Sequence, residues 1–127
     1  MANSLRLRLQ SGLHAMPLGR VFRIAAYASL SGQPDEYFRG WLKFHGQLAP
    51  VFDLNQVVCE SPTPEAYGSR ILLVQTAPQS PVPYVGLLAP GVTDTTSGDD
   101  PEVAPLDLDL YLQMLSTMIP ETPAAEP

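Results

Sequence analysis

The chain has 127 residues, of which 45% are hydrophobic, fourteen are proline and nine are glycine. This length allows one domain with a buried core, and the prolines and glycines would interrupt a series of long helices. All seven basic residues lie within residues 1–70, so this part carries a net charge of +2 and residues 71–127 a net charge of −8. Nucleic acid is therefore an improbable partner, and short strands with many turns are expected.

The cysteine content and the hydropathy indicate a soluble, cytoplasmic protein. Cys59 is the only cysteine, so no internal disulfide can form. Arg6 and Arg8 alternate with leucines near the start of the chain, which is unlike a signal peptide. No apolar run approaches the roughly 20 residues that a membrane-spanning helix needs.

The first elements are predicted to be two short strands. Leu5, Leu7 and Leu9 alternate with polar residues, which is typical of a strand with one buried face. A turn at residues 11–12 should lead to a partner strand over residues 13–17.

The next segment, residues 18–24, is compatible with either a helical turn or a strand. In both cases Val21 and Ile24 are expected in the core. Residues 29–36 contain a glycine, a proline and two acids, which predicts a surface loop.

Residues 37–54 read Y-F-R-G-W-L-K-F-H-G-Q-L-A-P-V-F-D-L and predict a β-hairpin. His45-Gly46-Gln47 is the expected turn, in which Gly46 can adopt a positive φ at little cost. Pro50 cannot donate a backbone hydrogen bond, so it should restrict the second strand to an edge or a bulge. Asp53 is placed to cap a short helical turn that follows.

After the hairpin, the sequence predicts a loop, two buried strands and a second loop. Continuous apolar runs indicate the strands, and proline-rich or acidic stretches indicate the loops. The expected bounds are a loop at 60–69, strands at 70–75 and 84–88, and a mobile loop at 93–105.

Residues 107–118 place apolar residues at helical spacing behind Asp107, whose charge suits a helix N-terminus, so a short amphipathic helix is predicted. The alternation of leucines over residues 106–112 leaves a strand as the competing interpretation. Residues 1–119 should form a single domain, and residues 120–127 a disordered tail.

Four blocks of this sequence, in order, resemble the CheW-like domain of bacterial chemotaxis coupling proteins. Residues 15–21 look like the family's A-x-P-L-x-x-V segment, and residues 39–54 look like its R-G-x-x-x-x-x-G-x-x-x-P-V-x-D-L hairpin. Residues 70–74 and 84–88 fit the two strands that follow. The blocks cover about residues 5–92.

The resemblance implies an all-β fold of two small intertwined SH3-like barrels with a short C-terminal helix. It also implies a scaffold with no catalytic residues, metal or cofactor, which couples the cytoplasmic tips of chemoreceptors to the regulatory domain of a CheA-type histidine kinase. The pathway would be chemotaxis or the related control of twitching pili.

The chain departs from the family pattern at several positions. His45 replaces the usual arginine in the hairpin, Arg23 stands where an acid is common, and Ala89-Pro90 replaces valine and aspartate. The second barrel is also expected to be shortened, because the closing L-D segment at residues 106–108 follows after only a short acidic loop. We hypothesise that a partner chain or a second copy covers the strand edges left open.

The shortened barrel leaves an alternative function. In that alternative, the protein is a divergent CheW-like protein that self-associates or binds another CheW-like domain instead of receptors.

Two sets of residues are predicted to carry the function. One set contacts partners, and the other holds the shape of the hairpin. The predicted partner contacts are Val21, Leu42, Phe44, His45 and Gly86, and the predicted hairpin residues are Arg39, Gly40, Gly46, Pro50 and Asp53.

Other chemistry is disfavoured by the sequence. His14, His45 and Cys59 lie on separate predicted elements without a paired ligand motif, so neither a metal site nor a nucleophile is expected. Asp107 and Asp109 are better explained by the start of a helix than by catalysis. A small hydrolase would need a nucleophile and base brought together by the fold.

Some roles stay open at this point. Arg39 could pair with Asp35, Glu36 or Asp53 in a structural ion pair. The aromatic side chains of the hairpin, at positions 41, 44 and 52, could belong to the core or to an interface.

Overall fold

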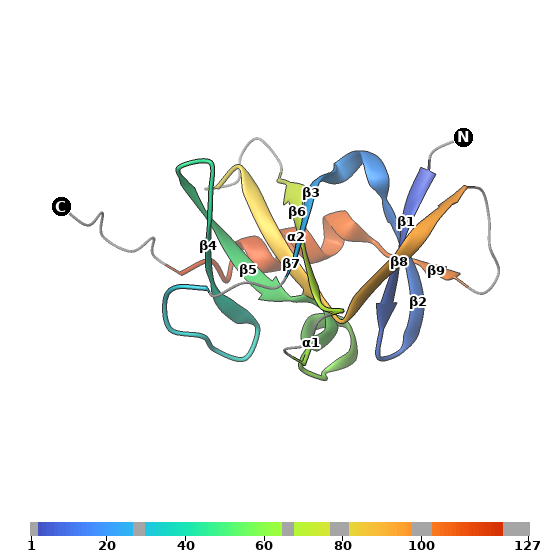
Figure 1. The fold of residues 1–127 in the computed structure, drawn as a ribbon. Helices are drawn as coiled ribbons and strands as arrows, with labels where there is room; N and C mark the ends of the chain where they lie inside the picture. Colours follow the sequence, from blue (N-terminus) through green and yellow to red (C-terminus); the bar gives the residue numbers. More distant parts are fainter. Residues whose placement is uncertain (1–2, 27–29, 65–67, 77–81, 98–102, 121–127) are drawn as a thin grey trace.

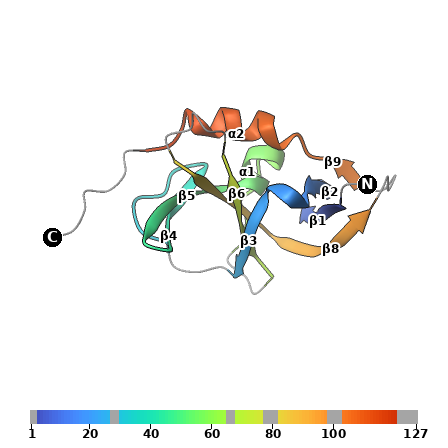
Figure 2. The ribbon, with the colours of Figure 1, turned by 90° about the horizontal axis from the view of Figure 1, so that it is seen from above.

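Two β-sheets and two α-helices make up the described part of the chain (Figure 1). In this computed structural model, that part comprises residues 3–26, 30–64, 68–76, 82–97 and 103–120. One sheet has four strands and the other has five, and we refer to them by these numbers. Figure 2 shows that helix α2 lies along one side of both sheets.

The four-stranded sheet has the strand order β8-β1-β2-β9. Strands β1 and β2 form the predicted hairpin, in which Leu9 lies opposite Gly12. The alternating leucines of β1 are buried, as the two-residue period predicts. Strand β9 is short and pairs in parallel with β2. The strands are β1 Asn3–Leu9, β2 Gly12–Pro17, β8 Gly91–Ser97 and β9 Val103–Pro105.

The five-stranded sheet has the strand order β3-β6-β7-β5-β4. Strands β4 and β5 are the predicted hairpin, and β6 and β7 are the two predicted buried strands. A short 3-10 turn, η1 (Leu18–Arg20), leads into β3, so the segment that the sequence left open contains both a turn and a strand. The strands are β3 Val21–Ala26, β4 Phe38–Phe44, β5 Gln47–Asp53, β6 Arg70–Gln75 and β7 Tyr84–Ala89.

Each helix begins at an aspartate that accepts a backbone hydrogen bond. The Asp53 side chain caps α1 (Leu54–Cys59), and the Asp107 side chain caps α2 (Leu108–Ser116). An N-terminal aspartate satisfies one of the free N–H groups of the first turn and complements the helix dipole. The predicted helix after Asp107 is thus confirmed over its strand alternative.

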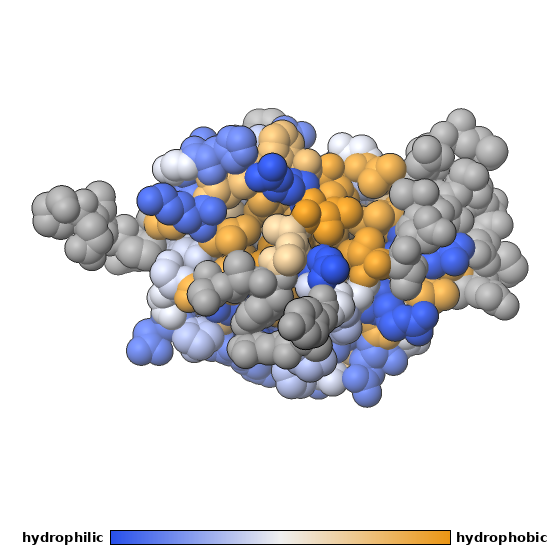
Figure 3. All heavy atoms as spheres, viewed as in Figure 1, coloured by the Kyte–Doolittle hydropathy of each residue, from blue (hydrophilic) through white to orange (hydrophobic). Residues whose placement is uncertain are grey.

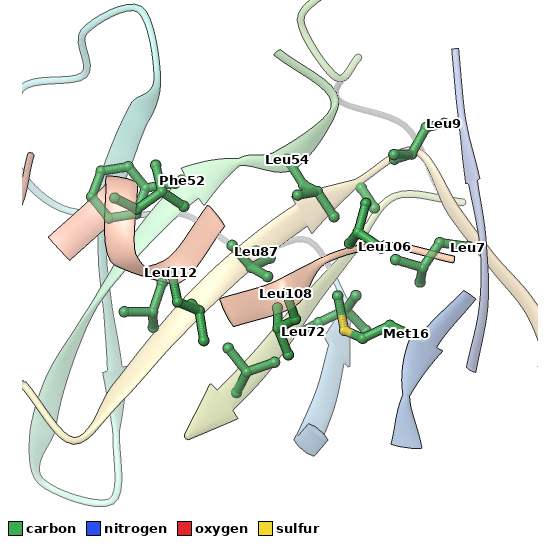
Figure 4. Close-up of a cluster of buried hydrophobic side chains, with 14 of the residues drawn as sticks. Leu7, Leu9, Met16, Phe52, Leu54, Leu72, Leu87, Leu106, Leu108 and Leu112 are labelled. Atoms are coloured by element: carbon green, nitrogen blue, oxygen red, sulfur yellow. The ribbon is translucent and has the colours of Figure 1, made fainter. Parts of the chain in front are cut away.

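The main core lies between the two sheets and α2 (Figure 4). It draws on both sheets, while two smaller buried clusters, Phe44-Ala49-Leu73 and Val51-Ile71-Leu88, lie within the five-stranded sheet alone. Burying one leucine contributes roughly 2 kcal/mol, which makes this shared cluster the dominant source of stability. Its members labelled in Figure 4 are Leu7, Leu9, Met16, Phe52, Leu54, Leu72, Leu87, Leu106, Leu108 and Leu112.

The expectations for residues 93–105 and for Ile24 are wrong. Residues 93–105 were expected to form a loop, but β8 and β9 occupy the described parts of this segment. The Thr-rich strand β8 is stabilised by its ladder with β1, which a local pattern does not reveal. Ile24 was expected in the core, yet its side chain is 42% exposed on the outermost strand β3. Most of the expected C-terminal tail, residues 121–127, lies outside the described residues.

Candidate partner-binding surface

Strand β3 exposes large apolar side chains on both of its faces. Phe22 is 53% exposed and Ile24 is 42% exposed. Ile24 pairs with Leu72, a residue of the main core, whereas Phe22 sits in a bulge between Val21 and Arg23. Edge strands of soluble proteins are usually protected by charged or short segments, and exposed apolar patches mark interaction sites. The β3 edge is therefore the leading candidate for a binding surface.

Three aromatic rings lie together beside this edge. Phe22 on β3 is 5.5 Å from Phe44 on β4 and 5.1 Å from Tyr84 on β7, measured between ring centroids. The Arg23 guanidinium carbon lies 5.6 Å from the Phe44 centroid, and the His45 ring lies 4.4 Å from it. We call these five residues the aromatic patch. It combines apolar area with one permanent cation, which suits a partner that presents apolar and acidic groups.

Hydrophobic residues gather over the middle of the face shown in Figure 3, where β3, β6 and β7 lie in Figure 1. Hydrophilic residues are more frequent toward the ends of this face. The arrangement resembles an interface with an apolar centre and a polar rim.

The residues predicted to contact partners fall into two groups. Phe44 and His45 belong to the aromatic patch, and Leu42 is half-buried on the same strand as Phe44. Val21 is half-buried at the start of β3 and packs against the main core, while Gly86 is buried in β7. Their roles as partner contacts stay predictions.

Gly86 has a clear packing role. A Cβ atom at this position would lie 2.9 Å from Val51 Cγ2, closer than Cβ atoms normally approach, and 3.0 Å from Ile71 Cγ2, which is also tight. The absence of a side chain at Gly86 therefore lets Val51 and Ile71 pack against the backbone at the centre of the five-stranded sheet.

Sequence reasoning missed Phe22 and Tyr84 as members of the surface, although Phe22 follows Val21 directly. The signal that could have indicated Phe22 is the apolar content of residues 21–24, Val-Phe-Arg-Ile, but this segment was too short to assign to a helix or a strand. Trp41 and Phe52 are buried in the main core, whereas Phe44 is buried in a small separate cluster directly beneath the exposed Phe22 ring of the aromatic patch.

A buried polar network holds the hairpin in shape. Asp53 is fully buried, and its carboxylate accepts hydrogen bonds from Arg39 Nη1 (3.0 Å), Gln56 N (3.2 Å), Thr63 N (2.7 Å) and Thr63 Oγ1 (2.5 Å). A buried carboxylate needs such partners, because an unpaired one is costly. Arg39 thus pairs with Asp53 among the three acids considered. Thr63, which the sequence did not single out, ties the following loop to the same carboxylate.

The turn of the hairpin has the backbone that the sequence predicts. His45 and Gly46 have φ values of 50° and 76°, and Phe44 lies opposite Gln47, so the loop contains two residues. Two consecutive positive φ values are typical of a type I′ turn. Gly46 adopts this conformation at little cost, whereas His45 does not.

Gly40 lets a neighbouring segment approach β4. Its φ is 134°, and a Cβ there would lie 2.6 Å from Leu30 Cβ and 2.8 Å from Ser31 O. Ser31 exchanges two backbone hydrogen bonds with Trp41 on β4. Gly40 therefore allows this segment to cover part of the outer edge of the hairpin.

The expectation for Pro50 is wrong, because β5 lies inside the sheet between β7 and β4. Pro50 lies opposite Trp41, whose backbone N–H and C=O both bond to Ser31 on the other side. This pair is thus one that exchanges no hydrogen bonds across β4 and β5. The parallel ladder to β7 begins only at Val51, so the missing N–H of Pro50 costs neither ladder a bond.

The fold brings His14 and Cys59, which the sequence placed on separate elements, to the same serine, Ser11, while His45 lies apart in the aromatic patch. The Cys59 thiol donates to Ser11 Oγ over 3.2 Å, and Ser11 Oγ lies 2.8 Å from His14 Nε2. Burial lowers the pKa of His14. Among the residues that the structure describes, no three His, Cys, Asp or Glu side chains are grouped to hold a metal ion. The cluster joins the β1–β2 turn to the end of α1.

Comparison of the sequence with family models and with curated proteins gives no match. Comparison with solved structures does. The crystal structure of the scaffolding protein TtCheW from Thermoanaerobacter tengcongensis matches with a TM-score of 0.66 over 78% of this chain, at 21% sequence identity. This chain has the CheW-like fold.

The likeness covers 63% of the TtCheW chain, so the two proteins differ in extent. The CheW-like fold here comprises a five-stranded and a four-stranded sheet, in agreement with one complete and one shortened barrel. In the described residues, no helix is long and apolar enough to cross a membrane.

Proposed function

We propose that this protein is a non-enzymatic adaptor of bacterial chemosensory signalling, which couples chemoreceptors to a CheA-type histidine kinase. The observation that carries the proposal is an edge strand, β3, with apolar side chains exposed on both faces in a chain of CheW-like fold. A scaffold needs stable surfaces for other proteins and no reactive groups. TtCheW is itself described as a scaffolding protein.

The β3 edge suits a partner that contributes an extended segment or a strand. Main-chain hydrogen bonds to an exposed edge supply affinity, and side-chain contacts on alternate faces supply specificity. A segment beside β3 would cover Phe22 on one face and Ile24 on the other. Arg23 would favour a carboxylate on the partner.

Binding to the isolated regulatory domain of the CheA-type kinase from the same organism tests the proposal. Ile24→Glu places a charge on the β3 edge and should weaken binding at least tenfold, because desolvating an unpaired charge at an interface is costly. Met114→Glu is the matched control, because Met114 is 40% exposed, about as much as Ile24, and lies on α2 and not on the β3 edge. It should change the dissociation constant by less than about twofold.

Two results would contradict the proposal. One is the absence of binding to the kinase domain and to the cytoplasmic tip of a receptor. The other is equal binding by the wild type and the Ile24→Glu variant. Circular dichroism of each variant verifies that the fold is retained.

The four-stranded sheet favours a second candidate function, self-association or binding to another CheW-like domain. Strand β9 has only three residues and pairs with β2 alone in the described part of the chain. Light scattering at high micromolar concentration separates the two functions. A stable dimer would support the second candidate, and a monodisperse monomer would count against self-association.

A further inference from the structure

The two sheets are built on the same plan. In each, a central antiparallel hairpin is flanked by one antiparallel strand and by one parallel strand: β3-β6-β7-β5 corresponds to β8-β1-β2-β9. In each, the parallel strand leads into a helix capped by an aspartate, Asp53 or Asp107. The chain is therefore a structural repeat, although its two halves differ in sequence.

The strand registers align the two halves residue by residue. Val51 and Pro105 both lie two residues before the capping aspartate, and their partners across the parallel pairs are Gly86 and Ala15. Each edge strand then has a register shift at the same place. The equivalent positions are Val51 and Pro105, Gly86 and Ala15, Leu73 and Arg6, Val74 and Leu7, and Val21 and Val92.

The alignment shows that the two edge strands have opposite character. The exposed sequence Phe22-Arg23-Ile24 of β3 corresponds to Thr93-Asp94-Thr95 of β8. Two large apolar residues are replaced by threonines, and the positive charge is replaced by a negative one. A partner that recognises the β3 edge through apolar contacts and a carboxylate would find neither feature at β8.

Within the described part of the chain, the four-stranded sheet also lacks a counterpart of the outermost strand, β4. Strand β4 covers the outer edge of β5, whereas no described strand covers β9. The N–H of Leu106 donates to Ala15 O, so the backbone of the preceding residue, Pro105, points to the open side. Proline has no N–H to offer there, and proline on an edge strand protects against strand addition, which counts against the second candidate function, self-association through β9.

We infer that the protein is a one-sided adaptor, which binds a single CheA-type regulatory domain through the β3 edge and ends an assembly at its four-stranded sheet. A repeat with two equivalent edges would bind at both and extend the assembly. Here the β3 edge carries the binding residues. In the four-stranded sheet, β8 has polar residues at the equivalent positions, and Pro105 blocks the outer edge of β9. The inference rests on the proposed function and adds its stoichiometry.

The test measures the mass of the complex by light scattering, with the kinase regulatory domain in tenfold excess. The expected complex contains one copy of each protein. Arg23→Asp and Asp94→Arg form a matched pair, because the two residues are equivalent in the repeat. Arg23→Asp should weaken binding at least tenfold, whereas Asp94→Arg should change the dissociation constant by less than about twofold.

The outcomes separate the inference from the proposed function. A complex with two kinase domains per chain, or a tenfold loss on Asp94→Arg, would overturn one-sided binding while leaving the adaptor function intact. Absence of binding by the wild-type chain would overturn both. A one-to-one complex that depends on Arg23 and not on Asp94 would support both.

Discussion

Replacing the buried carboxylate of Asp53 by an amide should destabilise the protein severely. Asp53→Asn keeps the size of the side chain but removes its charge and turns one acceptor oxygen into an N–H donor. In the wild type, one oxygen accepts from Arg39 Nη1 and Thr63 N, and the other accepts from Gln56 N and Thr63 Oγ1. An amide nitrogen in place of the first oxygen would face two groups that can only donate. In the other orientation it would still face Gln56 N–H, although the Thr63 hydroxyl could turn to accept.

The magnitude follows from the number and kind of bonds lost. Breaking a buried ion pair by removing one charge costs about 3–5 kcal/mol, since the remaining charge lacks its partner. The entropy of unfolding of a domain of 127 residues is about 0.27 kcal/mol/K near its melting temperature. A loss of about 4 kcal/mol should thus lower the melting temperature by about 15 °C.

Thermal unfolding followed by circular dichroism measures this shift, and Asp107→Asn is the matched control. Asp107 also caps a helix, but it is exposed, and asparagine is as good an N-cap as aspartate. The control should lower the melting temperature by no more than about 2 °C. Equal shifts for the two variants would refute the central role of the Asp53 network.

Three further predictions concern the hairpin turn, the sheet interior and the response to pH. Gly46→Val forces a β-branched residue to a φ of 76° and should lower the melting temperature by about 7 °C, whereas His45→Asn should raise it slightly; an unchanged value for Gly46→Val would contradict the turn argument. Gly86→Ala should destabilise the protein by about 1–3 kcal/mol in urea titration, because its methyl group meets two branched side chains; a neutral effect would show that the sheet can relax. The pKa of His14 is lowered in the folded state, so the unfolded chain binds more protons and His14 costs stability as the pH falls below about 6.5. His14→Gln should therefore lose less stability than the wild type between pH 7.5 and pH 5, and identical losses would exclude this contribution.

Local signals predicted most of the first 90 residues correctly. The leucine alternation of β1, the glycine turn of the hairpin and the apolar runs of β6 and β7 each act within a few residues, so sequence reveals them. The Arg39–Asp53 pair was one of three options from the sequence. Choosing among them required the fold, because the candidate acids are equally plausible in sequence.

The errors have a common physical cause, which is that pairing and burial depend on distant segments. Strand β8 is polar, and only its register with β1 makes it a strand. Pro50 avoids the cost expected in an interior strand because Trp41 bonds to Ser31 instead. Phe22 and Tyr84 are 62 residues apart in sequence, so their place in one surface could not be read from it.

The contact between Phe22 and Phe44 has a consequence for motion. Strands β3 and β4 stand at opposite ends of the sheet order, yet these two rings lie 5.5 Å apart, so the sheet curls enough for side chains of its two edge strands to touch while their backbones stay unpaired. Side chains, and no backbone ladder among the described residues, hold that junction. Ring contacts of this kind contribute only about 0.5–1.5 kcal/mol beyond burial, far less than the global stability of a domain. The barrel should therefore open along this seam first, with the amides of β3 exchanging with deuterium before those of β6 and β7.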